Sequence, residues 1–177
     1  MANNANVDYL FIGTENQINK LENFCKGIKN GVTMIDIVKC MGVNENTISV
    51  YGEAQTYLRK DKNTIEINFI CDWDWQRDFY NTMKNYFRKV YFTCEEIGNE
   101  LFECNTFTHF DCNIRYVIDG IYHEYFETLN DVKECLIDDI NDIKTATTAE
   151  QIKTLVKKYS VENNVDLRFY EYTLITE

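Results

Sequence analysis

The spacing of apolar residues along the first 97 positions alternates between the period of a strand and that of a helix. Four segments have the composition or the two-residue alternation of strands: residues 7–12, 48–58, 65–70 and 90–96. Three segments carry apolar residues at every third or fourth position and predict amphipathic helices: residues 14–28, 33–41 and 75–87. Proline is absent, so glycine and polar residues must mark the ends of these elements.

Local signals support several of these ends. Thr14 and Gln17 have the spacing of a capping box, in which each side chain accepts a hydrogen bond from an otherwise unpaired backbone N–H. Gly42 follows the second helix and predicts a left-handed stop at its C-terminal end. Asp72 or Asp74 is expected to cap the third helix.

Beyond residue 97 the chain contains two hairpin signals. Gly98–Asn99 predicts a turn that leads into a return strand beginning at Leu101. Asp119–Gly120 is suited to a type I′ turn between strands over 114–118 and 121–126.

Two helices and a strand complete the predicted elements. Thr128 is the expected cap of the first helix, whose apolar stripe extends to Ile143. Thr147 and Glu150 have the spacing of a capping box for the second helix. Residues 165–175 are rich in Phe, Tyr and Leu, which predicts a terminal strand.

The order of elements in residues 1–97 is strand, helix, strand, strand, helix, strand, with one short helix added. This is the order of the ferredoxin-like (βαββαβ) arrangement, an antiparallel four-stranded sheet backed by two helices. We therefore predict an α+β fold in which residues 1–97 form a ferredoxin-like core. Residues 98–177 would extend the sheet through β-hairpins and add a small α+β lobe with two C-terminal helices and a terminal strand. Because no linker, repeat or low-complexity tract is visible, we expect one cooperative domain.

The composition excludes several classes of function. Among 177 residues, 29 acids against 18 bases give a net charge of −11, so the chain lacks the basic surface needed to coat a nucleic acid or an anionic membrane. No apolar run approaches the roughly 20 residues of a membrane span, and the first residues lack the pattern of a secretory leader. The seven cysteines are expected to be reduced and largely buried. We therefore expect a cytoplasmic protein without a cofactor.

Four stretches together resemble the YubB-like, ferredoxin-like family of proteins encoded by plasmids, phages and conjugative elements. They are the first strand with Gly13 and the helix after it, Met41–Gly42 followed by Val50–Gly52, Cys71–Trp75, and Val90–Gly98. The chain departs from the family pattern around Trp73, where aspartates and a second Trp replace a small residue and prolines. The resemblance covers roughly residues 5–105. It implies a ferredoxin-like fold and a mobile-element setting, and it brings no catalytic residues.

One set of residues has the side chains of a zinc site: Cys94, Cys104, His109 and Cys112. Thiolates and imidazole are ligands that Zn²⁺ prefers. Structural zinc sites usually contain two tight Cys-x2-Cys pairs, whereas this set has one loose pair. The simpler interpretation places the cysteines in the core, and a small zinc-binding structural protein is one alternative.

No pattern typical of an enzyme is present. The chain has two histidines, His109 and His123, and it contains no G-x-S-x-G, H-E-x-x-H or glycine-rich phosphate loop. Pairs of carboxylates occur, but in so acidic a protein most acids are solvated. We predict that the protein is not an enzyme.

A module that binds single-stranded nucleic acid is a second alternative. RNA-recognition modules share the βαββαβ order and stack bases on aromatic side chains of the sheet. The candidates here are Tyr9, Phe11, Tyr51 and Phe69. Residues 66–71, however, lack the basic-glycine-aromatic pattern of such modules, so packing of these rings beneath helices is the simpler interpretation.

Two segments concentrate negative charge. The first contains Glu95, Glu96, Glu100 and Glu103, and the strongest candidates in the second are Glu134, Asp138, Asp139 and Asp142. Carboxylates in rows on a rigid element can imitate the phosphates of a nucleic acid and bind a basic groove. The plainer interpretation is a solvated surface that keeps the protein in solution.

From these features we predict a non-enzymatic, acidic protein of a phage or mobile element that binds another macromolecule. The acids would contact a basic protein surface, such as the nucleic-acid-binding surface of a host defence protein, which an anti-CRISPR-like inhibitor would occupy as a nucleic-acid mimic. Trp73 and Trp75, if exposed, would anchor this interface. The prediction requires both acidic segments to form one continuous surface.

Overall fold

The computed structural model describes residues 3–44, 48–108 and 113–176, whose contacts divide the chain into two compact units. Unit 1 comprises Met1–Thr106 and Ile175–Glu177, and unit 2 comprises Phe107–Leu174. Both units combine helices and strands, so the predicted α+β class is confirmed. The division lies nine residues after the expected boundary at residue 97, because the strand that follows this position pairs within unit 1.

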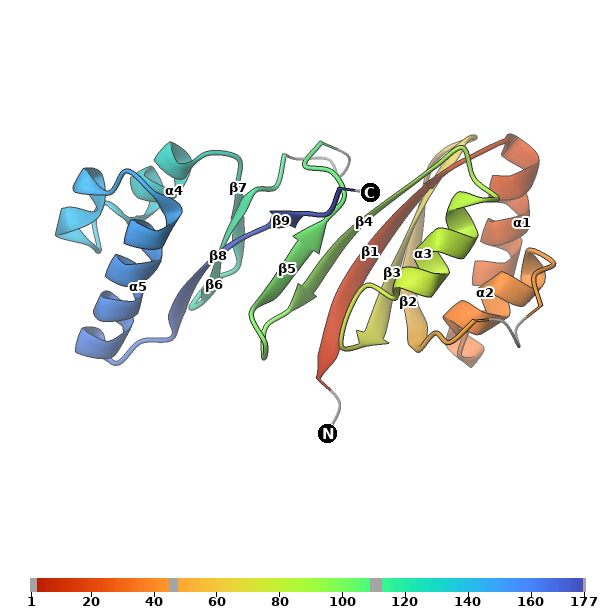
Figure 1. The fold of residues 1–177 in the computed structure, drawn as a ribbon, viewed down its shortest axis with the longest axis horizontal. Coiled ribbons are helices and arrows are strands. Elements are labelled where there is room, and N and C mark those ends of the chain that lie inside the picture. The colour runs from red at the N-terminus through yellow and green to blue at the C-terminus, as the bar shows by residue number, and fades with distance from the viewer. Residues whose placement is uncertain (1–2, 45–47, 109–112, 177) are drawn as a thin grey trace. The chain divides into compact units, whose positions relative to one another are not determined.

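Unit 1 is a sheet with helices on one of its faces (Figure 1). Its elements are β1 (Asn4–Ile12), α1 (Glu15–Cys25), the 3₁₀ helix η1 (Ile28–Asn30), α2 (Met34–Cys40), β2 (Gly52–Asp61), β3 (Thr64–Asp72), α3 (Arg77–Lys84), β4 (Lys89–Glu96) and β5 (Leu101–Cys104). These strands lie in the order β2-β3-β1-β4-β5, and every neighbouring pair among them is antiparallel. Near the C-terminal end of the chain, the Ile175 backbone N–H donates to the Cys104 carbonyl oxygen at 2.7 Å.

The two-residue period of the strands explains which face the helices cover. On β1, Val7, Tyr9 and Phe11 are completely buried, while the alternate residue Asp8 points to the opposite face. The Tyr9 ring packs edge-on against Phe79 of α3, with ring centroids 5.1 Å apart. Burial of these large side chains is the main source of stability in unit 1.

Several predicted ends of elements in unit 1 are confirmed. Thr14 caps α1, and both hydrogen bonds of its capping box with Gln17 are present. Gly42, with φ of 88°, follows α2 in the left-handed conformation. The second strand, predicted from residue 48, begins later, at Gly52.

Unit 2 contains a smaller sheet with helices packed against it (Figure 1). Its elements are β6 (Tyr116–Gly120), β7 (Glu124–Phe126), α4 (Leu129–Leu136), the 3₁₀ helix η3 (Asn141–Thr145), α5 (Ala149–Asn163), β8 (Leu167–Glu171) and β9 (Thr173–Leu174). Strand β6 lies between β7 and β8 and is antiparallel to both. The core beneath this sheet includes Val132 of α4, Ile152 and Val156 of α5, and Phe169 of β8.

The predicted two-residue turn at Asp119–Gly120 is wrong. Ile118 pairs with Glu124, strand β6 continues to Gly120, and residues 121–123 connect it to β7. Gly120 has a φ of 125° and belongs to β6, where a Cβ atom would lie 2.1 Å from the Asp166 carbonyl oxygen. The position therefore requires glycine because another backbone segment approaches it closely.

The helices of unit 2 also differ from the prediction in extent. Helix α4 ends at Leu136, well before Ile143. The apolar stripe nevertheless continues, since the side chains of Ile140, in the turn before η3, and Ile143, in η3, are both buried. An apolar stripe thus records which residues are buried, although the backbone beneath it changes from α-helix to turn.

The cap of α5 lies one residue later than predicted. Thr148 and Gln151 form the capping box, in place of Thr147 and Glu150. The Gln151 side-chain oxygen accepts from the backbone N–H groups of both threonines, at 2.7 Å and 3.2 Å. Both threonines are followed three residues later by a suitable partner, so the sequence pattern does not distinguish them.

Across the described ranges, no helix combines the length and the apolar character that crossing a bilayer requires.

Candidate binding groove

The loop between β3 and α3 contains two non-glycine residues in the left-handed conformation. Trp73 has a φ of 73° and Gln76 a φ of 59°. Such a conformation costs an L-residue about 1–2 kcal/mol, so it persists only where surrounding contacts determine it. Gln76 is also the residue that precedes α3, and the predicted caps Asp72 and Asp74 do not hold this position.

The side chain of Gln76 connects this loop to the segment before β2. Gln76 is 9% exposed, and its Oε1 accepts from the Tyr51 backbone N–H at 2.9 Å. Its Nε2 donates to the Asp72 carbonyl oxygen at 2.7 Å and to Asp74 Oδ1 at 3.2 Å. Asp74 Oδ1 also accepts from the Gln76 backbone N–H at 2.7 Å. Four hydrogen bonds therefore determine the conformation around Gln76.

Backbone contacts fix the rest of the loop. The Trp73 N–H donates to the Asn3 carbonyl oxygen at 3.0 Å, and the Asp72 N–H donates to the Tyr51 carbonyl oxygen at 3.1 Å. The buried Tyr9 hydroxyl donates to the Trp75 carbonyl oxygen. The loop is thus built in one conformation before any partner arrives, which lowers the entropy lost on binding.

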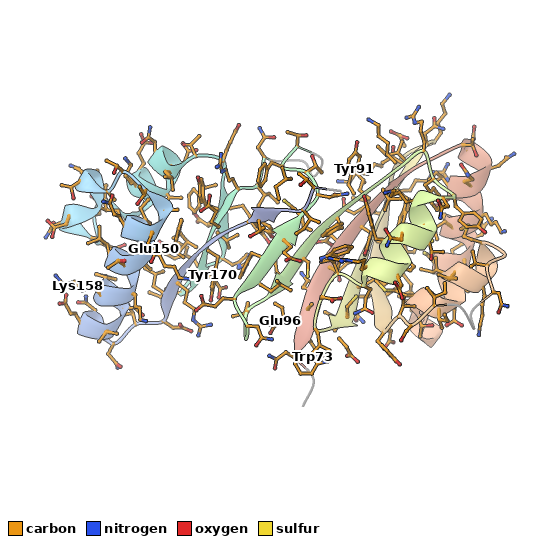
Figure 2. The ribbon with its side chains drawn as sticks, viewed as in Figure 1. Trp73, Tyr91, Glu96, Glu150, Lys158 and Tyr170 are labelled. Atoms are coloured by element: carbon orange, nitrogen blue, oxygen red, sulfur yellow. The ribbon has the colours of Figure 1, made fainter. Side chains whose placement is uncertain are left out.

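The two tryptophans that bracket Asp74 have different environments. Trp73 is 53% exposed and lies near the N-terminal end of β1 (Figure 2). Trp75 is buried and stacks on Phe92 with ring centroids 4.3 Å apart, and its Nε1 donates to Glu103 at 2.7 Å. Trp73 is available as an interface anchor, whereas Trp75 belongs to the core of unit 1.

Two adjoining hollows flank the loop. The first, of about 450 Å³, includes Tyr51, Trp73 and Asp78 in its lining. The second, of about 720 Å³, includes Ile35 and Ile70. Both are lined by Ser49, Tyr51 and Asp72, and the Tyr51 side chain is 63% exposed. We call these two hollows together the Tyr51–Trp73 groove.

The groove carries negative charge. Among the described residues, its lining contains four carboxylates and one guanidinium: Glu53, Asp72, Asp74, Asp78 and Arg77. The Arg77 guanidinium lies over the Trp75 ring, 5.5 Å from its centroid. Exposed aromatic rings among carboxylates suit a ligand that is both apolar and cationic.

The acids predicted as a row on unit 1 do not form one. Glu96 is 2% exposed, and its carboxylate accepts from the N–H groups of Gly98 and Asn99 at 2.8 Å and 2.7 Å, so it stabilises a turn (Figure 2). Glu95 pairs with Phe102 and Glu103 pairs with Cys94, which directs the two glutamates to opposite faces of the sheet. Glu100 is exposed.

The acids predicted on unit 2 are all exposed, but they do not follow one helix. Glu134 lies in α4, Asp138 and Asp139 lie in the turn after it, and Asp142 lies in η3. Asp139 accepts a hydrogen bond from the Tyr159 hydroxyl at 3.3 Å. The two acidic segments belong to different units.

The two described cysteines of the zinc alternative, Cys94 and Cys104, do not share one face of the sheet. Cys94 pairs with Glu103 and Cys104 pairs with Thr93, so the two thiols lie on opposite faces of the sheet. Burial raises the pKa of the Cys94 thiol and raises that of Cys104 to about 11, which keeps both protonated. His109 and Cys112 lie outside the described residues. Within the described part of the chain, no three His, Cys, Asp or Glu side chains could hold a metal ion.

Three of the four aromatic rings considered for stacking on nucleic-acid bases are buried. Tyr9, Phe11 and Phe69 are fully buried beneath the helices and pack on one another. On the opposite face of the central strands lie Asn6 and Asp8, which share the Asn68 side-chain amide at 2.7 Å and 2.8 Å. These three rings therefore cannot stack on bases, and Tyr51 alone among the four candidates is exposed.

These features define an α+β protein with a preformed aromatic and acidic groove on its first unit. No protein-family model, no curated protein and no solved structure matches this chain.

Proposed function

We propose that this protein acts by binding a basic surface of another protein, and that the Tyr51–Trp73 groove of unit 1 is the main contact. The observation that carries this proposal is an indole that is 53% exposed on a loop held by buried hydrogen bonds. A large aromatic side chain on a rigid support is the kind of residue that dominates binding energy at interfaces. Binding, without catalysis, is the activity that such a surface supports.

The proposal extends to the topology and the biological setting. The order β2-β3-β1-β4 with antiparallel neighbours supports a ferredoxin-like arrangement for unit 1. Together with the resemblance of residues 5–105, this favours a mobile-element protein that blocks a host protein. Its target would be a basic, nucleic-acid-binding surface.

The test compares variants that differ only in the groove. Wild-type protein, Trp73→Ala and Leu58→Ala are immobilised, and the proteins that they retain from an extract of the source cells are quantified by mass spectrometry. Leu58 is a matched control, because it is a large apolar side chain on unit 1 that is 56% exposed and lies outside the groove. We expect a basic protein that wild type and Leu58→Ala retain, that Trp73→Ala loses, and that about 0.5 M NaCl weakens.

Two results separate the groove from the acids of unit 2. If Trp73→Ala retains the same proteins as wild type, the groove is not the contact. If the double variant Asp138→Lys/Asp139→Lys also releases the basic protein, the exposed acids of unit 2 contribute to steering it.

A further inference from the structure

We infer that the groove binds an extended peptide segment, with a cationic side chain in the smaller hollow and an apolar side chain in the larger one. This inference rests on the proposed function and specifies the part of the partner that is recognised. It follows from the different linings of the two hollows.

The smaller hollow has the chemistry of a site for Arg or Lys. Asp72 and Asp78 line it together with the exposed Trp73 indole. A guanidinium or ammonium group placed over an indole face gains a cation–π interaction, and neighbouring carboxylates add charge-assisted hydrogen bonds. Arg77, the one basic residue in this lining, lies over Trp75, so its charge is directed to a different ring.

The larger hollow suits an apolar side chain. Its lining includes four aliphatic side chains, Ile35, Ile48, Val50 and Ile70. Polar residues such as Thr33 and Gln55 also belong to this lining and can meet the backbone of a bound segment. A pocket that combines apolar side chains with polar groups is the usual arrangement of a ligand site.

The two hollows are close enough to be filled by one short segment. They have Ser49, Tyr51 and Asp72 in common, and the Tyr51 side chain is 63% exposed. The Gln76 hydrogen bonds hold the segment around Tyr51 and the Trp73 loop in a single arrangement. A preformed groove of this kind binds an extended chain at low entropic cost.

The experiment uses the intact protein labelled with 5-fluorotryptophan. The sequence contains two tryptophans, so the ¹⁹F spectrum has two resonances, and Trp73→Phe assigns the one from the exposed indole. The probes are blocked hexapeptides of serine in which one arginine and one leucine are separated by one, two or three residues. Matched peptides replace arginine by the neutral isostere citrulline, or leucine by serine.

We expect the Trp73 resonance to shift saturably with at least one arginine–leucine peptide. Replacement of arginine by citrulline, or of leucine by serine, should weaken binding by about tenfold. Asp78→Asn should weaken the arginine peptide several-fold but leave the citrulline peptide unchanged. Glu15→Gln should have no effect, because Glu15 is likewise an acid in the first turn of a helix on unit 1 but lies outside the groove.

Three results would overturn the inference: no peptide shifts the resonance, citrulline binds as tightly as arginine, or a hexathymidylate shifts it at the same concentration. These are distinguishable from failure of the proposed function. If Trp73→Ala releases the basic protein while no peptide binds, the partner contacts the groove through a folded surface. If neither experiment responds to Trp73, both proposals are wrong.

Discussion

The left-handed conformation of Gln76 leads to a prediction with an unusual order of stabilities. Both Gln76→Ala and Gln76→Gly remove the three side-chain hydrogen bonds to Tyr51, Asp72 and Asp74. At about 1 kcal/mol for each hydrogen bond, both variants should lose roughly 2–3 kcal/mol of the free energy of unfolding. They differ in the backbone, because alanine at a φ of 59° keeps a steric penalty that glycine does not have.

The expected difference between the two variants follows from two opposing terms. Relief of the left-handed conformation favours glycine by about 1–2 kcal/mol. The greater freedom of glycine in the unfolded chain opposes this by about 0.5–1 kcal/mol. The glycine variant should therefore be more stable than the alanine variant by roughly 0.5–1 kcal/mol, although glycine is ordinarily the less stable of the two near a helix.

Urea unfolding followed by tryptophan fluorescence measures this difference, since both tryptophans belong to unit 1. Asn85, at the other end of α3, is a matched control because its φ of −76° and ψ of −16° are right-handed. There the order should reverse, with Asn85→Ala more stable than Asn85→Gly. An alanine variant at residue 76 that equals or exceeds the glycine variant would refute the left-handed assignment and, with it, the account of how the loop is held.

Two further predictions concern other parts of the protein. Burial raises the pKa of the Asp8 carboxyl from 3.8 to about 6. The folded state therefore holds this proton more tightly than the unfolded chain does. As the pH rises from about 4 to 6, the carboxylate ionises and the free energy of unfolding falls. Asp8→Asn should then raise the stability of unit 1 by up to about 3 kcal/mol near pH 7.5 and change it little near pH 4. Urea unfolding measures this, with Glu53→Gln as the control. An equal gain at both pH values would contradict the shifted pKa of Asp8. In unit 2, Thr148→Ala should lower stability by about 1 kcal/mol and Thr147→Ala by less than half of that in thermal unfolding, and equal losses would mean that α5 has no single cap.

Elements whose signals are local are predicted well from the sequence. The alternation on β1 and the Thr14–Gln17 capping box involve neighbours only a few residues apart, so the pattern contains all the information required. The one-residue error at the cap of α5 arose where two overlapping local patterns were both satisfied. The predicted end of α4 was too late because an apolar stripe specifies which residues are buried and does not specify the backbone conformation.

The candidate site depends on contacts between residues distant in the chain, and for that reason sequence reasoning found only part of it. The sequence indicates Trp73 as an interface anchor and Tyr51 only as a ring that could stack on bases. It gives no sign that Gln76 holds the two segments together, because the Tyr51–Gln76 hydrogen bond joins residues 25 positions apart. No sequence signal marks Gln76 as left-handed, since glycine is the residue that usually reports this conformation.

The charge of the protein also depends in part on sequence alone and in part on the tertiary structure. Composition alone established that the protein is strongly acidic, because net charge is a sum over residues and is independent of their arrangement. Composition does not determine which carboxylates a partner can reach. Glu96 is buried in a turn, and the pairing of β4 with β5 directs Glu95 and Glu103 to opposite faces of the sheet. Strand register and burial come from tertiary packing, so only the folded chain decided which acids and which tryptophan are exposed to a partner.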